Sequence, residues 1–320
     1  MPLQAIGTNM VVHMRRRLTF GPILVIILLG LMYLDFALTT LALPAGAGWL
    51  NPRGTNFPPG LVLLLLGMLA GARGGYELAR LFRACGIAAS SRHLTQAAAA
   101  GVLIGGLTTG IGEAAMVGQW AGPLLGTAAG LVVFLSMGFY IRDKELKGAA
   151  GAAAAAVFTF VYMGVVLGFL LAIRREYSIG VMLAVIAVVK ACDSGAYFTG
   201  TALGKHKLIR FVSPGKTWEG LIGGLVTAAA FGVGLLAVGK AYYPESLGTL
   251  VTLSYWQAGL IGVLLGATGQ AGDLSASVVK RDAGVKDSGA ILPGFGGMLD
   301  MLDSLLISAP LAWWLFHVMS

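Results

Sequence analysis

Five acidic and three basic residues lie close together in segment 272–303 of a chain that is otherwise poor in charge. Only 11% of the 320 residues are charged and 57% are hydrophobic, yet five of the 14 acidic residues fall here. The acids are Asp273, Asp282, Asp287, Asp300 and Asp303, and the bases are Lys280, Arg281 and Lys286. Charge is costly in apolar surroundings unless it is paired or binds a ligand. A cluster of both signs beside a glycine-rich loop (293–297) therefore suggests chemistry on a phosphate-bearing substrate.

The acids have the spacing of a cation site. Asp300 and Asp303 are three residues apart, so a helix that begins after the glycine-rich loop would carry both on one face. Mg²⁺ prefers a few carboxylates together with waters and substrate phosphates. The spacing alone is equally compatible with an ordinary acidic helix start. Asp273 follows an apolar run, where an acid indicates a functional role by default.

A second polar segment spans residues 193–224. It contains Asp193, with Lys190 one turn before it, and then Lys205, Ser213 and Lys216. The fragments around Lys205 and Lys216 are not P-loops, because the required first glycine is Arg210 in one case and His206 follows the lysine in the other. No strand is predicted before either fragment, which also argues against that motif.

The composition predicts an all-α polytopic membrane protein. The mean hydropathy is +0.83, and many apolar runs approach or exceed the roughly 20 residues that cross a bilayer. Asp35 and Glu77 are further acids inside such runs, and each is interpreted as the partner of a nearby arginine such as Arg73 or Arg80. Residues 1–172 and 173–320 are read as the N-terminal helices and the C-terminal catalytic region of one integral membrane unit. About nine spans are expected, near 18–43, 61–84, 96–112, 121–141, 149–172, 177–200, 219–243, 254–279 and 299–318.

The distribution of basic residues predicts the orientation. With the N-terminus in the cytoplasm, 17 of the 22 Lys and Arg residues fall on the cytoplasmic side, as the positive-inside rule requires. The same topology places loops 201–218 and 280–298 together on the cytoplasmic face. The net charge of +8 is explained in this way, so it does not indicate a nucleic-acid partner.

The two polar segments resemble a known family. The stretch SASVVKRDAGVKDSGAILPGFGGMLDMLD (275–303) is similar to the C-terminal motif of phosphatidate cytidylyltransferases, also called CDP-diacylglycerol synthases. The fragments DSGAYFTG, GKHKL and SPGKTWEG (193–220) resemble that family's second motif, and the similarity covers about the last 130 residues. Two positions depart from the pattern, since Phe295 replaces a histidine and Met301 replaces an arginine.

The resemblance implies a reaction and a set of roles. CTP and phosphatidic acid would give CDP-diacylglycerol and pyrophosphate for phospholipid biosynthesis, with Mg²⁺ and with a second cation left open. Asp273 and Asp300 would be the main metal ligands, with Asp303 and Asp287 in support. The partners would be CTP, phosphatidic acid and membrane lipids. The protein would lie in the bacterial plasma membrane with its site facing the cytoplasm. A homodimer is left open. The phosphate-binding and catalytic candidates are Lys280, Arg281, Lys286 and Asp287, and the substrate-binding candidates are Lys205, Ser213, Lys216, Ser277, Gly296 and Gly297.

Three other functions stay open at this point. The acceptor could be a polyprenyl or other lipid, because Phe295 and Met301 change the motif. The chain could be an inactive relative that binds lipid or partners. A transporter would explain the charges inside apolar runs, such as Lys190 and Asp193, but not their concentration beside glycine-rich loops on one face.

Overall fold

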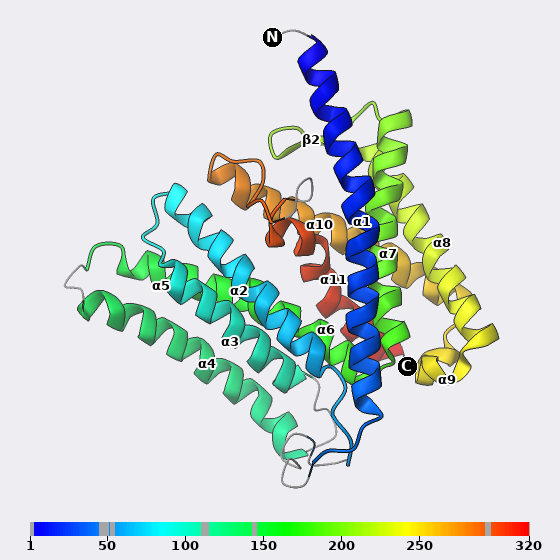
Figure 1. Ribbon diagram of the computed structural model, residues 1–320, viewed down its shortest axis with the longest axis horizontal. Coiled ribbons are helices and arrows are strands. Elements are labelled where there is room, and N and C mark those ends of the chain that lie inside the picture. The colour runs from blue at the N-terminus through cyan, green and yellow to red at the C-terminus, as the bar shows by residue number, and fades with distance from the viewer. Residues whose placement is uncertain are drawn as a thin grey trace.

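The protein is described by a computed structural model that covers residues 3–44, 51, 55–109, 115–142, 146–291 and 296–319. Almost all regular structure is helical (Figure 1). The elements are α1 (Leu3–Thr39), α2 (Leu61–Ala84), α3 (Ser91–Thr109), α4 (Ala115–Arg142), α5 (Ala149–Thr159), the π-helical η2 (Phe160–Val165), α6 (Val166–Glu176), α7 (Ile179–Leu203), β1 (Lys207–Ile209), β2 (Ser213–Thr217), α8 (Trp218–Tyr242), α9 (Pro244–Leu247), the 3-10 helix η3 (Gly248–Thr252), α10 (Tyr255–Asp282) and α11 (Met298–Met319).

Seven of the described helices are long and apolar enough to cross a membrane, and an eighth span is possible. The seven are Gly21–Thr39 of α1, α2, Trp120–Ile141 of α4, the continuous run α5–η2–α6, α7, α8 and α11. The eighth would be α10 together with the short helices before it, which meet it at an angle of 93°. The expected span near 96–112 corresponds to α3, which is helical but not among the seven. A mostly helical protein with several candidate membrane spans is therefore confirmed, whereas the count of nine and the cytoplasmic N-terminus stay predictions.

A short hairpin is the part of the fold that the all-α expectation does not contain. Strands β1 and β2 are antiparallel, with Lys207 opposite Thr217 and Ile209 opposite Ser213. Strands this short, with a proline and a glycine in β2, lack the apolar alternation that reveals a strand in a sequence. Thr217 ends the hairpin and also starts α8, because its side chain accepts a hydrogen bond from the Gly220 amide.

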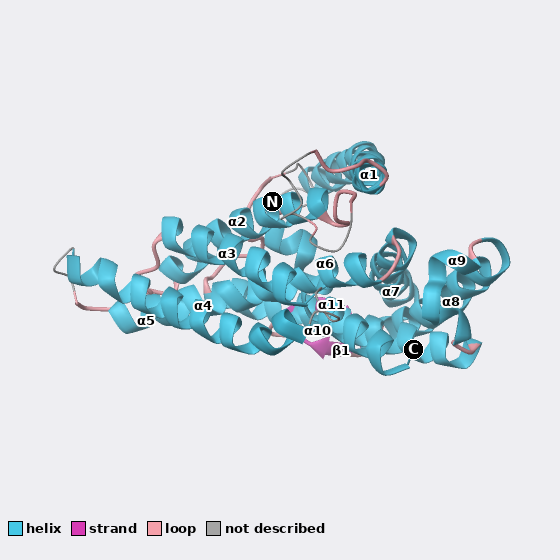
Figure 2. Ribbon diagram, turned by 90° about the horizontal axis from the view of Figure 1, so that it is seen from below, coloured by secondary structure: helices cyan, strands magenta, loops and turns pink. Residues whose placement is uncertain are grey.

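Helices α10 and α11 join the two sides of the bundle. One buried core lies around α7, α8 and α10, with Leu305 and Phe316 from α11. A second core lies around α2, α3 and α6, with Leu299 and Leu306 from the other face of α11. Figure 2 shows α10 and α11 in the middle of the bundle, between α4 and α5 at one end and α8 and α9 at the other. The helices that carry the predicted acids are thus held from both sides.

Candidate active site

The hairpin closes onto α10 and brings the two polar segments together. Arg281 near the end of α10 donates from Nε to the carbonyl oxygen of Val212 at 3.1 Å. Lys216 from β2 lies 2.9 Å from Asp273, measured from Nζ to Oδ2, and 3.3 Å from the carbonyl oxygen of Gln270. The Lys216 side chain is only 17% exposed, so this ion pair is a fixed contact between the hairpin and the helix.

Asp273 and Asp303 form an acidic pair where α10 crosses α11. Their side chains interact directly, and Asp303 is buried while Asp273 is partly exposed. The helices can approach closely because Gly272 has no side chain; a Cβ there would lie 2.3 Å from the carbonyl oxygen of Asp303. The Ser304 amide donates to Asp303 Oδ1 at 2.7 Å. Two like charges held together in an apolar bundle repel each other unless a proton or a cation lies between them.

Asp300, the third predicted metal ligand, is held by the protein itself. Its Oδ1 accepts from Lys280 Nζ at 2.6 Å, and both side chains are nearly buried. Its Oδ2 accepts from the amides of Ser288 and Gly297 at 2.8 and 2.9 Å, and from the Ser288 hydroxyl at 2.9 Å. Both oxygens therefore already have donors. This arrangement suits a residue that fixes the start of α11 and the position of Lys280, and it leaves Asp273 and Asp303 as the better-placed cation ligands.

The two predicted glycines sit tightly against this network. Gly296 has a φ of 79°, a conformation that favours glycine. A Cβ on Gly297 would lie 2.2 Å from the Ser288 hydroxyl and 2.4 Å from Glu77 Oε2. Both positions therefore require glycine so that the loop can pack against Asp300. Phe295 lies outside the described residues, and Met301 is half-buried on α11.

Glu77 on α2 belongs to the same network, which its spacing in the sequence does not reveal. It is fully buried, and its oxygens accept from the amides of Met298 and Leu299 at 2.9 and 3.0 Å and from the Ser288 hydroxyl at 2.8 Å. Arg73, its expected partner, lies 3.4 Å away, measured from Arg73 Nε to Glu77 Oε1. Glu77 thus caps α11 from another helix. Asp35, in contrast, pairs with Arg174 at 2.9 Å rather than with Arg73 or Arg80.

We expect Glu77→Gln to lower kcat by roughly 10- to 100-fold, as loss of residues that orient a site does. A glutamine keeps the shape but replaces one acceptor oxygen by an amide that cannot accept from the α11 amides. The expected signature is faster hydrogen exchange at 297–301. Asp35→Asn is the matched control, because Asp35 is equally buried and accepts from the amides of Gly60 and Val62 at the other end of α2. Equal losses of kcat in both variants would show that Glu77 contributes only general stability.

Of the remaining predicted residues, two are buried or half-buried and the others are exposed. Ser277 is buried on α10, one turn after Asp273, and Ser213 is half-buried in β2. Lys205 is exposed, and its amide donates to Glu219 at the start of α8. Lys286 and Asp287 are exposed in the turn after α10. Within the described residues, the last two take no part in the network that connects the acids.

A second polar group lies against the acidic pair on the α7 side. Lys190 donates from Nζ to Ser304 Oγ at 2.7 Å and to Asp193 Oδ2 at 3.2 Å. Gln270 of α10 donates from Nε2 to Asp193 Oδ1 at 3.0 Å. Three cations (Lys190, Lys216 and Lys280) therefore lie around the acidic pair, and each comes from a different element. Such surroundings can receive a polyanion and a divalent cation together.

The donor set fits Mg²⁺ when a substrate supplies the other ligands. In the described part of the chain, no group of three or more His, Cys, Asp or Glu side chains is placed to hold a metal alone. The contact between Asp273 and Asp303 nevertheless offers two carboxylates that need a positive charge between them. Mg²⁺ is commonly bound by one or two carboxylates plus phosphate oxygens, so this pair is compatible with it.

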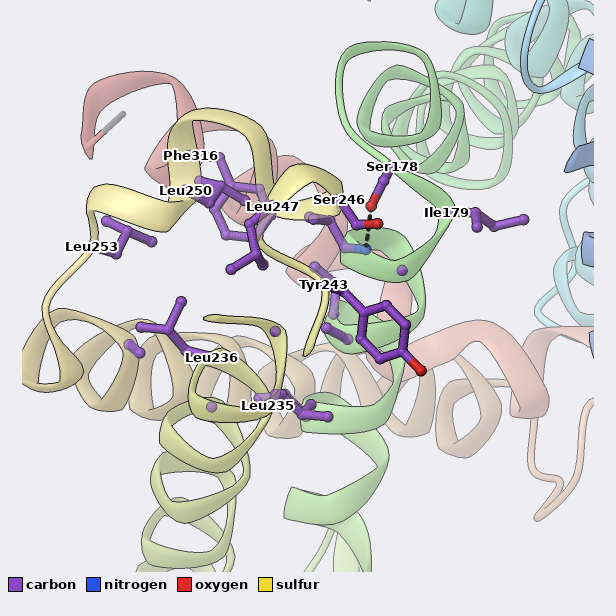
Figure 3. Close-up of a pocket in the computed structure, with 18 of the residues that line it drawn as sticks. Ser178, Ile179, Leu235, Leu236, Tyr243, Ser246, Leu247, Leu250, Leu253 and Phe316 are labelled. Atoms are coloured by element: carbon purple, nitrogen blue, oxygen red, sulfur yellow. Dashed lines mark hydrogen bonds between the residues drawn. The ribbon is translucent and has the colours of Figure 1, made fainter. Parts of the chain in front are cut away.

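An apolar cavity at the other end of α7 is separate from this site. It has a volume of about 660 Å³ and is lined by residues such as Leu235, Leu236, Leu250 and Phe316. Figure 3 shows Ser178 and Tyr243 at this cavity, which are the residues that precede α7 and follow α8. The hairpin lies at the opposite ends of these two helices, so the cavity is remote from Lys216. None of the described residues that line it is acidic, so the described lining does not supply the chemistry of the polar site.

Comparison with known proteins identifies the family. The model of the Cytidylyltransferase family matches residues 55–319, and the chain belongs to this family. It is 43% identical over 129 residues to the uncharacterized protein YnbB of Escherichia coli, covering 40% of each chain. It is 45% identical over 130 residues to the phosphatidate cytidylyltransferase of Haemophilus influenzae, covering 40% of this chain and 43% of that one. For the phosphatidate cytidylyltransferase of Mycobacterium bovis, the identity is 33% over 217 residues, 63% and 67% of the two chains. The chain thus spans about two fifths to two thirds of these relatives.

Proposed function

We propose that the protein transfers the cytidylyl group of CTP to phosphatidic acid and so forms CDP-diacylglycerol and pyrophosphate. The observation that carries this proposal is the acidic pair Asp273–Asp303 with Lys216 and Lys280 beside it. These groups match what a triphosphate and a divalent cation need, and they lie on α10, α11 and the hairpin, within a bundle whose long helices are candidate membrane spans. Membership of the cytidylyltransferase family and the names of its bacterial relatives support the same reaction.

The reaction requires positioning more than covalent help from the protein. A phosphate oxygen of the lipid attacks the α-phosphorus of CTP, and the bond from that phosphorus to the oxygen bridging the β-phosphorus breaks. The pyrophosphate leaves with the electron pair, so charge builds up on the leaving group. When bound, Mg²⁺ would neutralise charge on the triphosphate and on the leaving pyrophosphate.

The side chains of the site have distinct roles in this proposal. Asp273 and Asp303 would hold the cation, and Lys216 would contact phosphate oxygens of CTP from the hairpin while it keeps Asp273 in place. Asp300 orients Lys280 by a short, nearly buried ion pair. Glu77 and Ser288 fix the start of α11, on which Asp300 and Asp303 lie. Catalysis would then depend on a rigid arrangement of charges that exists before CTP arrives.

We further propose that the hairpin side of the bundle faces the cytoplasm of a bacterium, with the protein in its plasma membrane. CTP is cytosolic, and the hairpin carries several basic residues of the kind that gather on that side. In Figure 1 the N-terminal end of α1 and the hairpin lie on the same side of the bundle. This arrangement supports a cytoplasmic N-terminus.

The acceptor can be tested with the purified protein in lipid nanodiscs, CTP and Mg²⁺. Parallel reactions would contain phosphatidic acid, diacylglycerol or a polyprenyl phosphate, and mass spectrometry would identify the lipid product. We expect CDP-diacylglycerol from phosphatidic acid, with one pyrophosphate released for each product formed. A product only from another acceptor would overturn the proposed substrate, and the absence of any cytidylylated lipid would overturn the proposed activity.

A further inference from the structure

A groove between α7 and α8 opens on the outer surface of the bundle. Its volume is about 520 Å³, and its lining includes Lys190, Ser194, Phe198, Thr199, Thr227 and Phe231. Phe198 is 69% exposed and Phe231 is 48% exposed. Both helices are candidate membrane spans, so exposed phenylalanines on them face lipid rather than water. The groove therefore opens toward the bilayer.

Lys190 is the cation in the wall of this groove. Its side chain is 43% exposed, although it lies near the middle of α7. An ionisable residue inside a span is costly and usually serves function. Its ammonium contacts Ser304 at 2.7 Å, and Ser304 follows Asp303 in the chain. Lys190 thus connects the lipid-facing groove with the acidic pair.

The hydrogen bonds around Lys190 allow it to bind another anion. An ammonium has three N–H donors, and two of them are used by Asp193 and Ser304. If Lys190 turned toward an anion in the groove, Asp193 would keep its hydrogen bond from Gln270. The contact between Lys190 and Asp193 is also long, at 3.2 Å, and both side chains are partly exposed. An entering phosphate can therefore compete for the ammonium without leaving Asp193 unpartnered.

We propose that this groove is the lateral entrance for the acceptor lipid and that Lys190 binds its phosphate monoester. The lipid would enter from the bilayer between α7 and α8, with an acyl chain along Phe198 and Phe231. Its phosphate would reach Lys190, next to Asp303, whereas CTP would approach from the hairpin. This inference rests on the proposed function, because it assigns the acceptor of that reaction to one side of the site.

The kinetic test uses Lys190→Met, which keeps most of the length of the side chain and removes its charge. We expect the KM for phosphatidic acid to rise about tenfold or more, as loss of a charged hydrogen bond does, while the KM for CTP changes less than about twofold. Lys190→Arg should recover part of the loss. Lys240→Met is the control, since Lys240 lies in the last turn of α8, at the end away from the hairpin, and contacts the Leu253 carbonyl. An equal rise in both KM values for Lys190→Met would contradict the proposal.

A binding test separates this inference from the proposed activity. Phosphatidic acid with a photoreactive acyl chain would be crosslinked to the protein in nanodiscs without CTP, beside a photoreactive phosphatidylcholine. We expect crosslinks at α7 and α8 around Phe198 and Phe231 for phosphatidic acid, which Lys190→Met reduces and added inorganic phosphate does not. Crosslinks elsewhere, or equal labelling by phosphatidylcholine, would overturn the groove assignment. Crosslinks in the groove of a protein that forms no cytidylylated lipid would support the site and refute only the reaction.

Discussion

Replacing Asp303 by Asn is expected to lower kcat by about 10³-fold, a loss typical of removing a group that stabilises the transition state, while the protein stays folded. An amide has nearly the same shape and keeps an oxygen to accept from the Ser304 amide. It loses the negative charge that, with Asp273, would hold a divalent cation. The measurement is the rate of cytidylylated lipid formation as a function of Mg²⁺ concentration.

The same variant has a second expected result that does not depend on turnover. Without divalent cations, Asp303→Asn should unfold at a higher temperature than the unaltered protein, because it removes the repulsion between the buried Asp303 carboxylate and the partly exposed Asp273 carboxylate. Added Mg²⁺ should stabilise the unaltered protein and leave the variant nearly unchanged. Asp282→Asn is the matched control, since Asp282 is an exposed acid at the end of α10. Activity near normal in Asp303→Asn would exclude it as a cation ligand.

Replacing Lys216 by Met is expected to reduce kcat/KM for CTP by about 10²- to 10³-fold, as loss of a charged contact to the reacting phosphates does. Lys216 is the partner of Asp273 and the one lysine of the hairpin that reaches α10 in the described structure. Its loss would remove a phosphate ligand and deprive Asp273 of its ion-pair partner. Steady-state kinetics with varied CTP, together with equilibrium binding of CTP, would measure both effects.

Lys207→Met tests whether the hairpin charge alone matters. Lys207 is exposed on β1 and lies opposite Thr217 in the register, so it shares the hairpin but not the contact with Asp273. We expect this variant to retain nearly full activity. Similar losses in both variants would show that Lys216 acts through the general positive charge of the hairpin rather than through its position at Asp273.

Much of the site could be predicted because charge is rare in this chain. The charges of Asp273, Asp303 and Lys216 are conspicuous among apolar residues. Their proximity follows from the prediction that the two polar segments lie on the same cytoplasmic face. The long helices were also predictable, since a run of apolar residues has few alternatives in a membrane. The hairpin was not, because strands of three and five residues leave no periodic signal.

The roles within the site depend on contacts that the sequence does not show. Glu77 caps α11 across a separation of 221 residues from Met298, and no local pattern encodes that pairing. Asp300 has the spacing of a cation ligand, yet Lys280, Ser288 and Gly297 occupy its oxygens. Spacing along a helix decides which side chains share a face, but the partners of those side chains depend on how α2, α10 and α11 pack.

Cytidylyl transfer and phosphate transfer from CTP are distinguished most directly by following the separate phosphates of CTP. Two parallel reactions with phosphatidic acid and Mg²⁺ would use CTP labelled at the α-phosphorus or at the γ-phosphorus. We expect the α-label to enter the lipid phase and the γ-label to be recovered in pyrophosphate. Transfer of the γ-label to the lipid would instead indicate a CTP-dependent kinase, and that result would contradict cytidylyl transfer at the Asp273–Asp303 pair.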